Sequence, residues 1–173
     1  QDAPGQGSPC IGGIGPTADG RRKPEILAPG CGTISADAGT ACGVTAETGT
    51  SMACPAIAGA ALLARQYYTD GFYPSGIAVP EDARTPSGAL LKATLINAAV
   101  DMTGVTGYPS NGEGWGRLLL DNGLYFSGDA RKLVIADVRN VSGLTTSKTV
   151  SFPLNVLSAG QPLKIVLAFT SPA

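Results

Sequence analysis

One serine in this sequence has the surroundings of a nucleophile. Ser51 follows Gly49-Thr50 and lies shortly before an apolar run over 56–64. The pattern predicts a sharp turn into a helix over about 51–66. A serine at a helix start has an unpaired backbone N–H beside its hydroxyl, and the helix dipole favours an oxyanion there. The same position also suits an ordinary N-cap serine, which is the commoner role of this residue type.

The chain lacks the base that usually activates such a serine. No histidine occurs among its 173 residues. A complete Ser-His-Asp or Cys-His set therefore cannot be built from this chain alone. Zinc sites with histidine ligands are excluded for the same reason, and the four cysteines lack the spacing of a four-cysteine site.

Composition sets the protein class. The formal net charge is −1, from 12 Lys+Arg against 13 Asp+Glu, which argues against nucleic-acid or anionic-membrane partners. Hydrophobic residues make up 43% and charged residues 14%, as in a globular domain rather than a disordered chain. No apolar run approaches the roughly 20 residues of a membrane span.

The cysteines give an expectation about the compartment. Cys10, Cys31, Cys42 and Cys54 all lie in the first third of the chain. Cys31 and Cys42 bracket a loop that a disulfide can close, and free buried thiols are the alternative. Low charge with clustered cysteines favours a secreted or extracytoplasmic setting. Asn140-Val141-Ser142 fits a glycosylation sequon, a pattern that also arises by chance.

The elements around Ser51 follow from turn and helix signals. Pro24–Ala28 predicts a short strand and 31–48 a loop of small residues. The helix after Ser51 has little polar character on any side, so we expect it to be buried, with Pro55 tolerated in its first turn. A second helix is predicted over 86–100, with Thr85 as N-cap and Pro86 at the first helical position.

The pattern changes in the last third of the chain. Strands are predicted over 133–138, 149–156 and 163–170, the last with clean alternation of apolar residues. We place a boundary near Gly128, which gives one domain over 1–127 and the beginning of a β domain over 128–173. Trp115 lies between glycines near this boundary, and we expect it to pack in a core.

The segment from Gly49 to Gly59, Gly-Thr-Ser-Met-Ala-Cys-Pro-Ala-Ile-Ala-Gly, resembles the serine signature of the subtilases, the subtilisin-like serine proteases. Four further segments resemble the family in the same order: 15–30, which ends in Ala-Pro-Gly, then 86–99, 112–120 and 162–171. The last is similar to an early strand of the jelly-roll domain that many subtilases have after the protease domain. Their fold is an α/β sandwich with a mostly parallel sheet. The resemblance implies that this chain is the C-terminal portion of it, followed by the first strands of an all-β domain.

The resemblance implies a serine endopeptidase that hydrolyses peptide bonds in protein or peptide substrates. Ser51 matches the nucleophile, and its backbone N–H would donate to the oxyanion. The hydroxyl of Thr50 would make a secondary contact there, and Gly49 permits the turn. Pro55 and Gly59 match helix-packing positions. Cys54 matches a variable position, read as a buried small residue rather than a second nucleophile.

The family's Asp, His and oxyanion Asn have no counterpart here, and the family order Asp, His, Ser would place them upstream of Gln1. We therefore expect no useful protease activity from this chain alone. The alternatives are a non-catalytic pseudoprotease or interaction module, and one chain of a nicked protease whose partner chain supplies His and Asp. A Gly-x-Ser-x-Gly hydrolase elbow fits poorly, because no apolar strand precedes Ser51.

No cofactor is expected for this chemistry. Subtilases often bind structural calcium, and Asp101, Glu113 and Asp121 are acidic candidates for it. None of the three has the spacing of a ligand loop, so solvated surface charge is the expectation for each.

Overall fold

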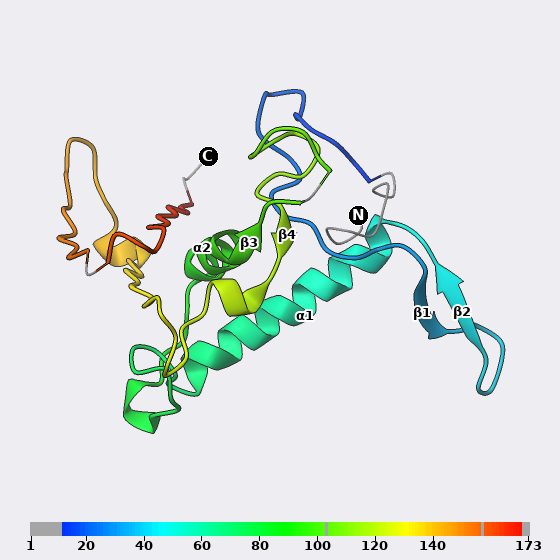
Figure 1. Ribbon diagram of the computed structural model, residues 1–173, viewed down its shortest axis with the longest axis horizontal. Coiled ribbons are helices and arrows are strands. Elements are labelled where there is room, and N and C mark those ends of the chain that lie inside the picture. The colour runs from blue at the N-terminus through cyan, green and yellow to red at the C-terminus, as the bar shows by residue number, and fades with distance from the viewer. Residues whose placement is uncertain (1–11, 103, 157, 171–173) are drawn as a thin grey trace.

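The computed structural model describes residues 12–102, 104–156 and 158–170 (Figure 1). These residues form a mixed α/β fold with helices α1 (Thr50–Thr69) and α2 (Gly88–Ala98). Hairpin strands β1 (Thr33–Ala36) and β2 (Val44–Glu47) make one antiparallel sheet, and β3 (Ala99–Val100) with β4 (Arg117–Leu118) makes a second. Short 3-10 turns lie at Pro80–Asp82, Leu120–Asn122 and Asn140–Ser142. No helix in the described ranges is long and apolar enough to cross a bilayer.

Helix α1 confirms the helix predicted after the Gly-Thr-Ser turn and extends it at both ends. Gly49 occupies the N-cap, so Ser51 lies in the first turn and is not the cap. Pro55 lies inside the helix rather than in its first turn. Because proline has no N–H, the Ser51 carbonyl four residues earlier lacks its usual helical donor.

The prediction that this helix is buried is wrong for most of its length. Only Ala64, Tyr67 and Tyr68 are buried, whereas Leu62 and Leu63 are 67% and 58% exposed. A helix that is apolar on all sides needs neighbours on all sides, and the described residues cover only one stripe of α1. The uncovered face, here called the exposed stripe, comprises Pro55, Ala58, Gly59, Leu62 and Leu63.

Helix α2 is shorter than predicted, and its cap differs. Ser87 is the N-cap, with its Oγ accepting from the Leu90 N–H at 3.0 Å, so Thr85 and Pro86 lie outside the helix. Asp137 accepts hydrogen bonds from both the backbone N–H and the hydroxyl of Ser87. Lys164 caps the C-terminal end of α2 by donating hydrogen bonds to the carbonyls of Asn97 and Ala99 at 3.0 Å. Residues far along the chain thus stabilise both ends of α2.

The core lies between the C-terminal end of α1 and helix α2. Buried Tyr67, Tyr68 and Leu90 form its centre. The Tyr68 hydroxyl is 2.9 Å from the Thr94 hydroxyl, and the Tyr67 hydroxyl donates to the Tyr125 carbonyl at 2.7 Å. Both phenols therefore have partners for their polar ends. Partly buried hydrophobic side chains surround this centre: Phe72, Tyr73, Leu91, Leu124, Leu133 and Ile135.

The mostly parallel sheet is not formed by the described residues. The segment 24–28, predicted as a strand, makes a single parallel bridge between Leu27 and Arg117. Leu27 N donates to the Gly116 carbonyl at 2.9 Å, and Leu118 N donates to the Leu27 carbonyl at 3.0 Å. Leu27 thus lies beside β4. The pairing ends after one bridge because the segment begins with Pro24 and is followed by Pro29, and proline has no N–H to donate to a neighbouring strand.

Residues 33–47 form a hairpin where a loop was predicted. Ile34 pairs with Ala46 and Ala36 with Val44, which places four apolar residues on one face. The opposite face consists of polar residues, Thr33, Ser35, Thr45 and Glu47. The runs Thr-Ile-Ser-Ala and Val-Thr-Ala-Glu around a glycine-containing turn were the signal for this hairpin. The hairpin projects from the body of the molecule at the N-terminal end of α1 (Figure 1).

No β-strand occurs within residues 128–156 or 158–170, so the three strands predicted there are wrong. An extended segment becomes a stable strand only when a neighbour takes up its backbone hydrogen bonds, and these segments have none. Ile165, Leu167 and Phe169 are 75%, 83% and 75% exposed. The boundary near Gly128 stays a prediction.

The disulfide prediction between Cys31 and Cys42 is wrong. Cys31 is disulfide-bonded, whereas Cys42 is a free, exposed thiol. Cys54 is also free and exposed, so the expected buried position does not hold for it. Its exposure follows from its place in the uncovered N-terminal part of α1.

Candidate active site

The turn before Ser51 is fixed by the Ala-Pro-Gly segment that precedes it in the sequence. Gly49 N donates to the Gly30 carbonyl at 2.8 Å, and Gly32 N donates to the Thr48 hydroxyl at 2.9 Å. A Cβ on Gly30 would lie 2.6 Å from the Gly49 carbonyl oxygen, a distance that only glycine avoids. The two glycine-containing segments therefore contact each other directly, and this contact sets the position where α1 begins.

Ser51 lies in the first turn of α1 with an exposed side chain. The Gly49 carbonyl accepts from Met52 N at 3.1 Å and from Ala53 N at 3.3 Å. Neither the hydroxyl nor the backbone N–H of Ser51 has a hydrogen-bond partner among the described residues. An N–H in this position points away from the helix toward solvent. A backbone N–H and a hydroxyl of one residue thus have no partner among the described residues, at the positive end of a 20-residue helix.

Thr50 is exposed at the same turn and Gly49 precedes it as the N-cap. The structure thus brings the three predicted residues together at one helix end. It does not test their roles, so the secondary oxyanion contact of Thr50 and the nucleophilic role of Ser51 stay predictions. No histidine is present anywhere in the sequence.

A small cavity lies on the covered side of the same helix end. It has a volume of about 180 Å³, and it is lined from α1 by Thr50, Ala53, Cys54 and Ile57. Residues 24 and 26–28 and Gly12-Gly13 complete its walls, while Ser51 does not line it. The lining is apolar except for Thr50. We interpret this space as a packing gap beside the serine turn rather than a substrate pocket.

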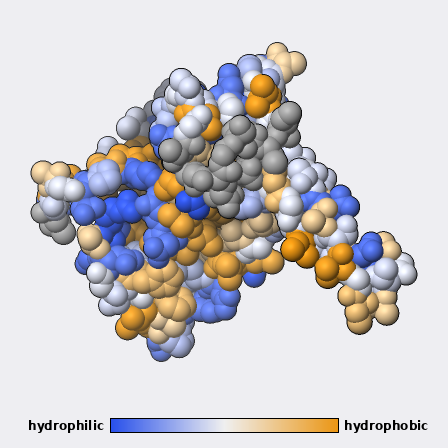
Figure 2. All heavy atoms as spheres, turned by 45° about the vertical axis from the view of Figure 1, so that its right-hand side comes forward, coloured by the Kyte–Doolittle hydropathy of each residue, from blue (hydrophilic) through white to orange (hydrophobic). Residues whose placement is uncertain are grey.

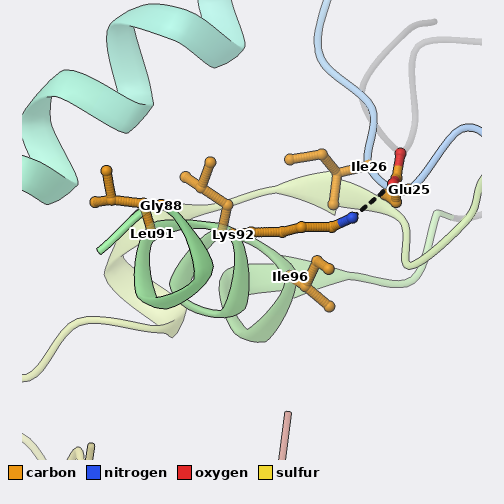
Figure 3. A pocket seen from close by; sticks show the side chains of 7 residues that line it. Glu25, Ile26, Gly88, Leu91, Lys92 and Ile96 are labelled. Carbon is orange, nitrogen blue, oxygen red and sulfur yellow. Dashed lines mark hydrogen bonds and ion pairs between the residues drawn. The ribbon is translucent and has the colours of Figure 1, made fainter. Parts of the chain in front are cut away.

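A larger hollow of about 400 Å³ lies between α2 and the segment 24–28 (Figure 3). Leu91, Leu95 and Ile96 of α2 face Ile26 across it. At its rim, Lys92 pairs with Glu25 at 3.0 Å. Lys23 contacts the same carboxylate at 2.6 Å. These cations lower the pKa of Glu25 against the opposing effect of its burial. No nucleophile lines this hollow.

The three acidic residues considered for calcium do not form a cluster. Asp101 and Asp121 are exposed, whereas Glu113 is completely buried, which corrects the expectation of a solvated charge there. Within the part of the chain that the structure describes, no group of three or more His, Cys, Asp or Glu residues is placed to hold a metal ion.

Trp115 does not pack in the core as expected. It is 38% exposed, and the Arg22 guanidinium lies 5.4 Å from the centre of its ring. Its backbone N–H donates to the Glu25 carbonyl at 2.7 Å, so the backbone of Trp115, rather than its ring, joins 24–28 to the turn before β4. Sequence reasoning also missed Asp137 and Lys164, since nothing local in the sequence indicates which helix ends they reach.

Comparison with known proteins defines the class. Residues 11–116 match the sequence profile of the subtilase family, which covers more than half of the chain. The chain therefore belongs to the subtilase family of serine proteases.

Two curated relatives and one solved structure are similar to it. The serine protease/ABC transporter B family proteins tagB and tagD of Dictyostelium discoideum are both 37% identical, over 144 and 142 residues. Each match covers 64% of this chain and 8% of the relative, so the chain spans less than a tenth of their length. The Clostridium perfringens CspB protease is 26% identical, with a TM-score of 0.45, over 61% of this chain and 20% of that one.

Proposed function

We propose that this chain supplies the nucleophile of a subtilisin-type serine endopeptidase. The observation that supports this most is the state of Ser51: exposed, in the first turn of α1, with its hydroxyl and backbone N–H both free among the described residues. In the proposed reaction the Ser51 Oγ attacks the scissile carbonyl of a protein substrate. The Ser51 N–H then donates to the oxyanion that forms.

Activity requires groups that this chain does not contain. Without a base, a serine hydroxyl is a weak nucleophile. In subtilisin, itself a member of this family, loss of the serine or the histidine costs about 10⁶-fold in kcat. We therefore propose that His, Asp and an oxyanion Asn come from other residues of the same protein or from a complementary chain.

The exposed stripe of α1 offers a surface on which the residues that supply His and Asp could pack. Its five residues are apolar or small, and a Cβ on Gly59 would meet nothing within 4 Å. Glycine in the middle of a helix costs helix stability, so its presence is explained by the close approach of another element. Figure 2 shows hydrophobic residues at the surface over much of the face that it presents. We propose that the residues carrying His and Asp pack on this stripe.

The experiment uses the natural protein that contains this chain. Its peptidase activity on a denatured protein substrate is measured for the wild type, Ser51→Ala and a matched Ser35→Ala control on the hairpin. We expect Ser51→Ala to abolish activity and Ser35→Ala to retain it. A Ser51→Ala protein with wild-type activity would contradict the nucleophilic role.

The second candidate is a non-catalytic interaction module, favoured by the absence of histidine from the chain. The intact mass of the natural protein and the fragments that co-purify with it distinguish the protease from the interaction module. A longer polypeptide, or a co-purifying fragment with a histidine, supports the protease. A natural product that begins at Gln1 and co-purifies with no such fragment supports the module.

We also propose a secreted or extracytoplasmic location, supported by the disulfide at Cys31. Asn140-Val141-Ser142 is the sole sequon in the sequence, and Val141 is 97% exposed. In secretory expression, a glycan removable by a glycosidase should be lost in Asn140→Gln but not in Asn155→Gln, because residue 157 is leucine rather than serine. Absence of any glycan on the secreted wild type would contradict the use of this sequon.

A further inference from the structure

The turn from Ser110 to Gly116 is held in one position by its neighbours. Ser110 and Gly114 exchange backbone hydrogen bonds of 3.2 and 2.8 Å. Gly114 and Gly116 have φ angles of 63° and 90°, a region that favours glycine. A Cβ on Gly116 would lie 1.9 Å from the Val100 carbonyl oxygen, and one on Gly114 would lie 2.1 Å from the Pro24 carbonyl oxygen. The turn therefore lies tightly between the segment 24–28 and β3.

Glu113 lies in this turn, directly before Gly114, and its side chain is fully buried, with 0% exposure. One carboxyl oxygen, Oε2, accepts from the Met102 N–H at 2.9 Å. No described residue donates a hydrogen bond to the other oxygen, Oε1, which is buried, and the Asp101 carboxyl lies within hydrogen-bond reach of the Glu113 carboxyl. A buried carboxylate with an unpaired oxygen is strongly unfavourable, because the lost hydration is not replaced.

The charges around Glu113 do not compensate for its burial. Burial is the largest cause that raises its pKa, the Met102 N–H lowers it, and the nearby Asp101 carboxylate raises it further. Tyr108 also interacts with both carboxyl groups, and its own pKa is raised, chiefly by burial. On the neighbouring elements, Lys23 and Lys92 are engaged by Glu25, and Arg117 of β4 makes no ion pair with Glu113.

We propose that Glu113 is a proton-binding site. Its neutral carboxylic acid donates a hydrogen bond to the Asp101 carboxylate and holds the turn 110–116 against Met102. When the pH rises, the proton is lost to solvent, and the resulting carboxylate moves out of the buried site to become hydrated. Its exit removes the acceptor of the Met102 N–H and loosens the turn from β3. A cation bridging Asp101 and Glu113 is the competing explanation, and the described residues offer no third His, Cys, Asp or Glu ligand for it.

The direction of the pH effect follows from linkage. Because the pKa of Glu113 is raised by folding, the folded chain binds this proton more tightly than the unfolded chain. The stabilisation is fully present below the ordinary glutamate pKa of about 4.5 and is lost as the pH rises through the raised value. Glu113→Gln keeps the shape and the oxygen acceptor but cannot ionise, so it removes this pH dependence.

The experiment measures thermal unfolding of the chain between pH 4.5 and 8, with wild type, Glu113→Gln and the exposed control Glu81→Gln. We expect Tm to fall with rising pH by about 3–6 °C more for wild type and Glu81→Gln than for Glu113→Gln. Parallel profiles for all three would overturn the proposal. Calcium that abolishes the difference, with a chelator restoring it, would also overturn it in favour of a cation site.

A second measurement needs no variant to fold. An NMR titration of the Glu113 side-chain carboxyl in the wild-type chain reads its protonation directly. We expect the midpoint of this titration to lie above the ordinary glutamate range. Above that midpoint, hydrogen exchange of the Met102 amide should be faster than base catalysis alone explains. A midpoint at or below the ordinary glutamate value contradicts the proposal.

Discussion

The two ends of α1 have opposite environments, and the more apolar end is the less buried one. At the C-terminal end, here called the tyrosine end (64–69), Ala64 and Tyr68 are 0% exposed, and Tyr67 stacks with Phe72 at a ring separation of 5.6 Å. At the N-terminal end, here called the serine end (50–63), Leu62 is 67% exposed, and the Ser51 hydroxyl and N–H have no partner in the part of the chain that the structure describes. The hydrophobicity of a helix thus does not decide its burial. Burial depends on which neighbours are present, and the tyrosine end has neighbours that the serine end lacks.

This difference separates stability from function within one helix. The tyrosine end contacts α2 and the residues that follow it, so it holds the fold together. Among the described residues, the serine end is joined to the rest of the molecule through the Gly49–Gly30 hydrogen bond and through the residues that line the small cavity. It also presents the proposed nucleophile. Substitutions at the two ends should therefore affect different measurements.

The largest effect is expected at the tyrosine end. Tyr68→Ala removes a fully buried ring and its hydrogen bond to Thr94, and should lower the free energy of unfolding by about 3–5 kcal/mol. Leu62→Ala, on the exposed stripe, should change it by less than about 1 kcal/mol. Urea unfolding of both variants checks the contrast, and equal losses would show that the two ends are equivalent.

A smaller loss is expected where α2 begins. Ser87→Ala removes the N-cap oxygen that accepts from Leu90 N and one of the two contacts with Asp137. It should lower the free energy of unfolding by about 1 kcal/mol, whereas Ser75→Ala, in an exposed turn, should have little effect. If Ser87→Ala lowered the free energy of unfolding as much as Tyr68→Ala, capping of α2 would contribute as much to stability as core packing, contrary to this prediction.

The smallest effect is expected at the serine end, with the opposite sign. Gly59→Ala places a methyl group in open space and raises helix propensity, so the isolated chain should gain up to about 1 kcal/mol. In the complete protease the same methyl group should lower activity, if another element packs closely on the stripe. Denaturant unfolding gives the first value and a peptidase assay the second; undiminished activity would argue against a close contact there.

Local signals predicted the turn and helix around Ser51 better than the surrounding fold. The Gly-Thr-Ser turn and α1 follow from residues adjacent in sequence, and both are confirmed. The caps of α2 depend on Asp137 and Lys164, some 50 and 65 residues from their contacts, which no local pattern indicates. The hairpin at 33–47 had a local signal in its two alternating runs, but its many small residues favoured the prediction of a loop. The strands expected after 128 show the limit of periodicity, since alternation identifies a strand-compatible segment but not its neighbour.

The most direct test of the proposed function is the rate at which a fluorophosphonate labels Ser51. The probe is reacted with the isolated chain and with the complete natural protein, and the modified peptide is identified by mass spectrometry, with Ser51→Ala as the blank. We predict labelling of Ser51 in the complete protein and only background labelling in the isolated chain, because the base lies outside it. Labelling of the isolated chain at the rate of the complete protein, or labelling of the complete protein at a residue other than Ser51, would contradict this account.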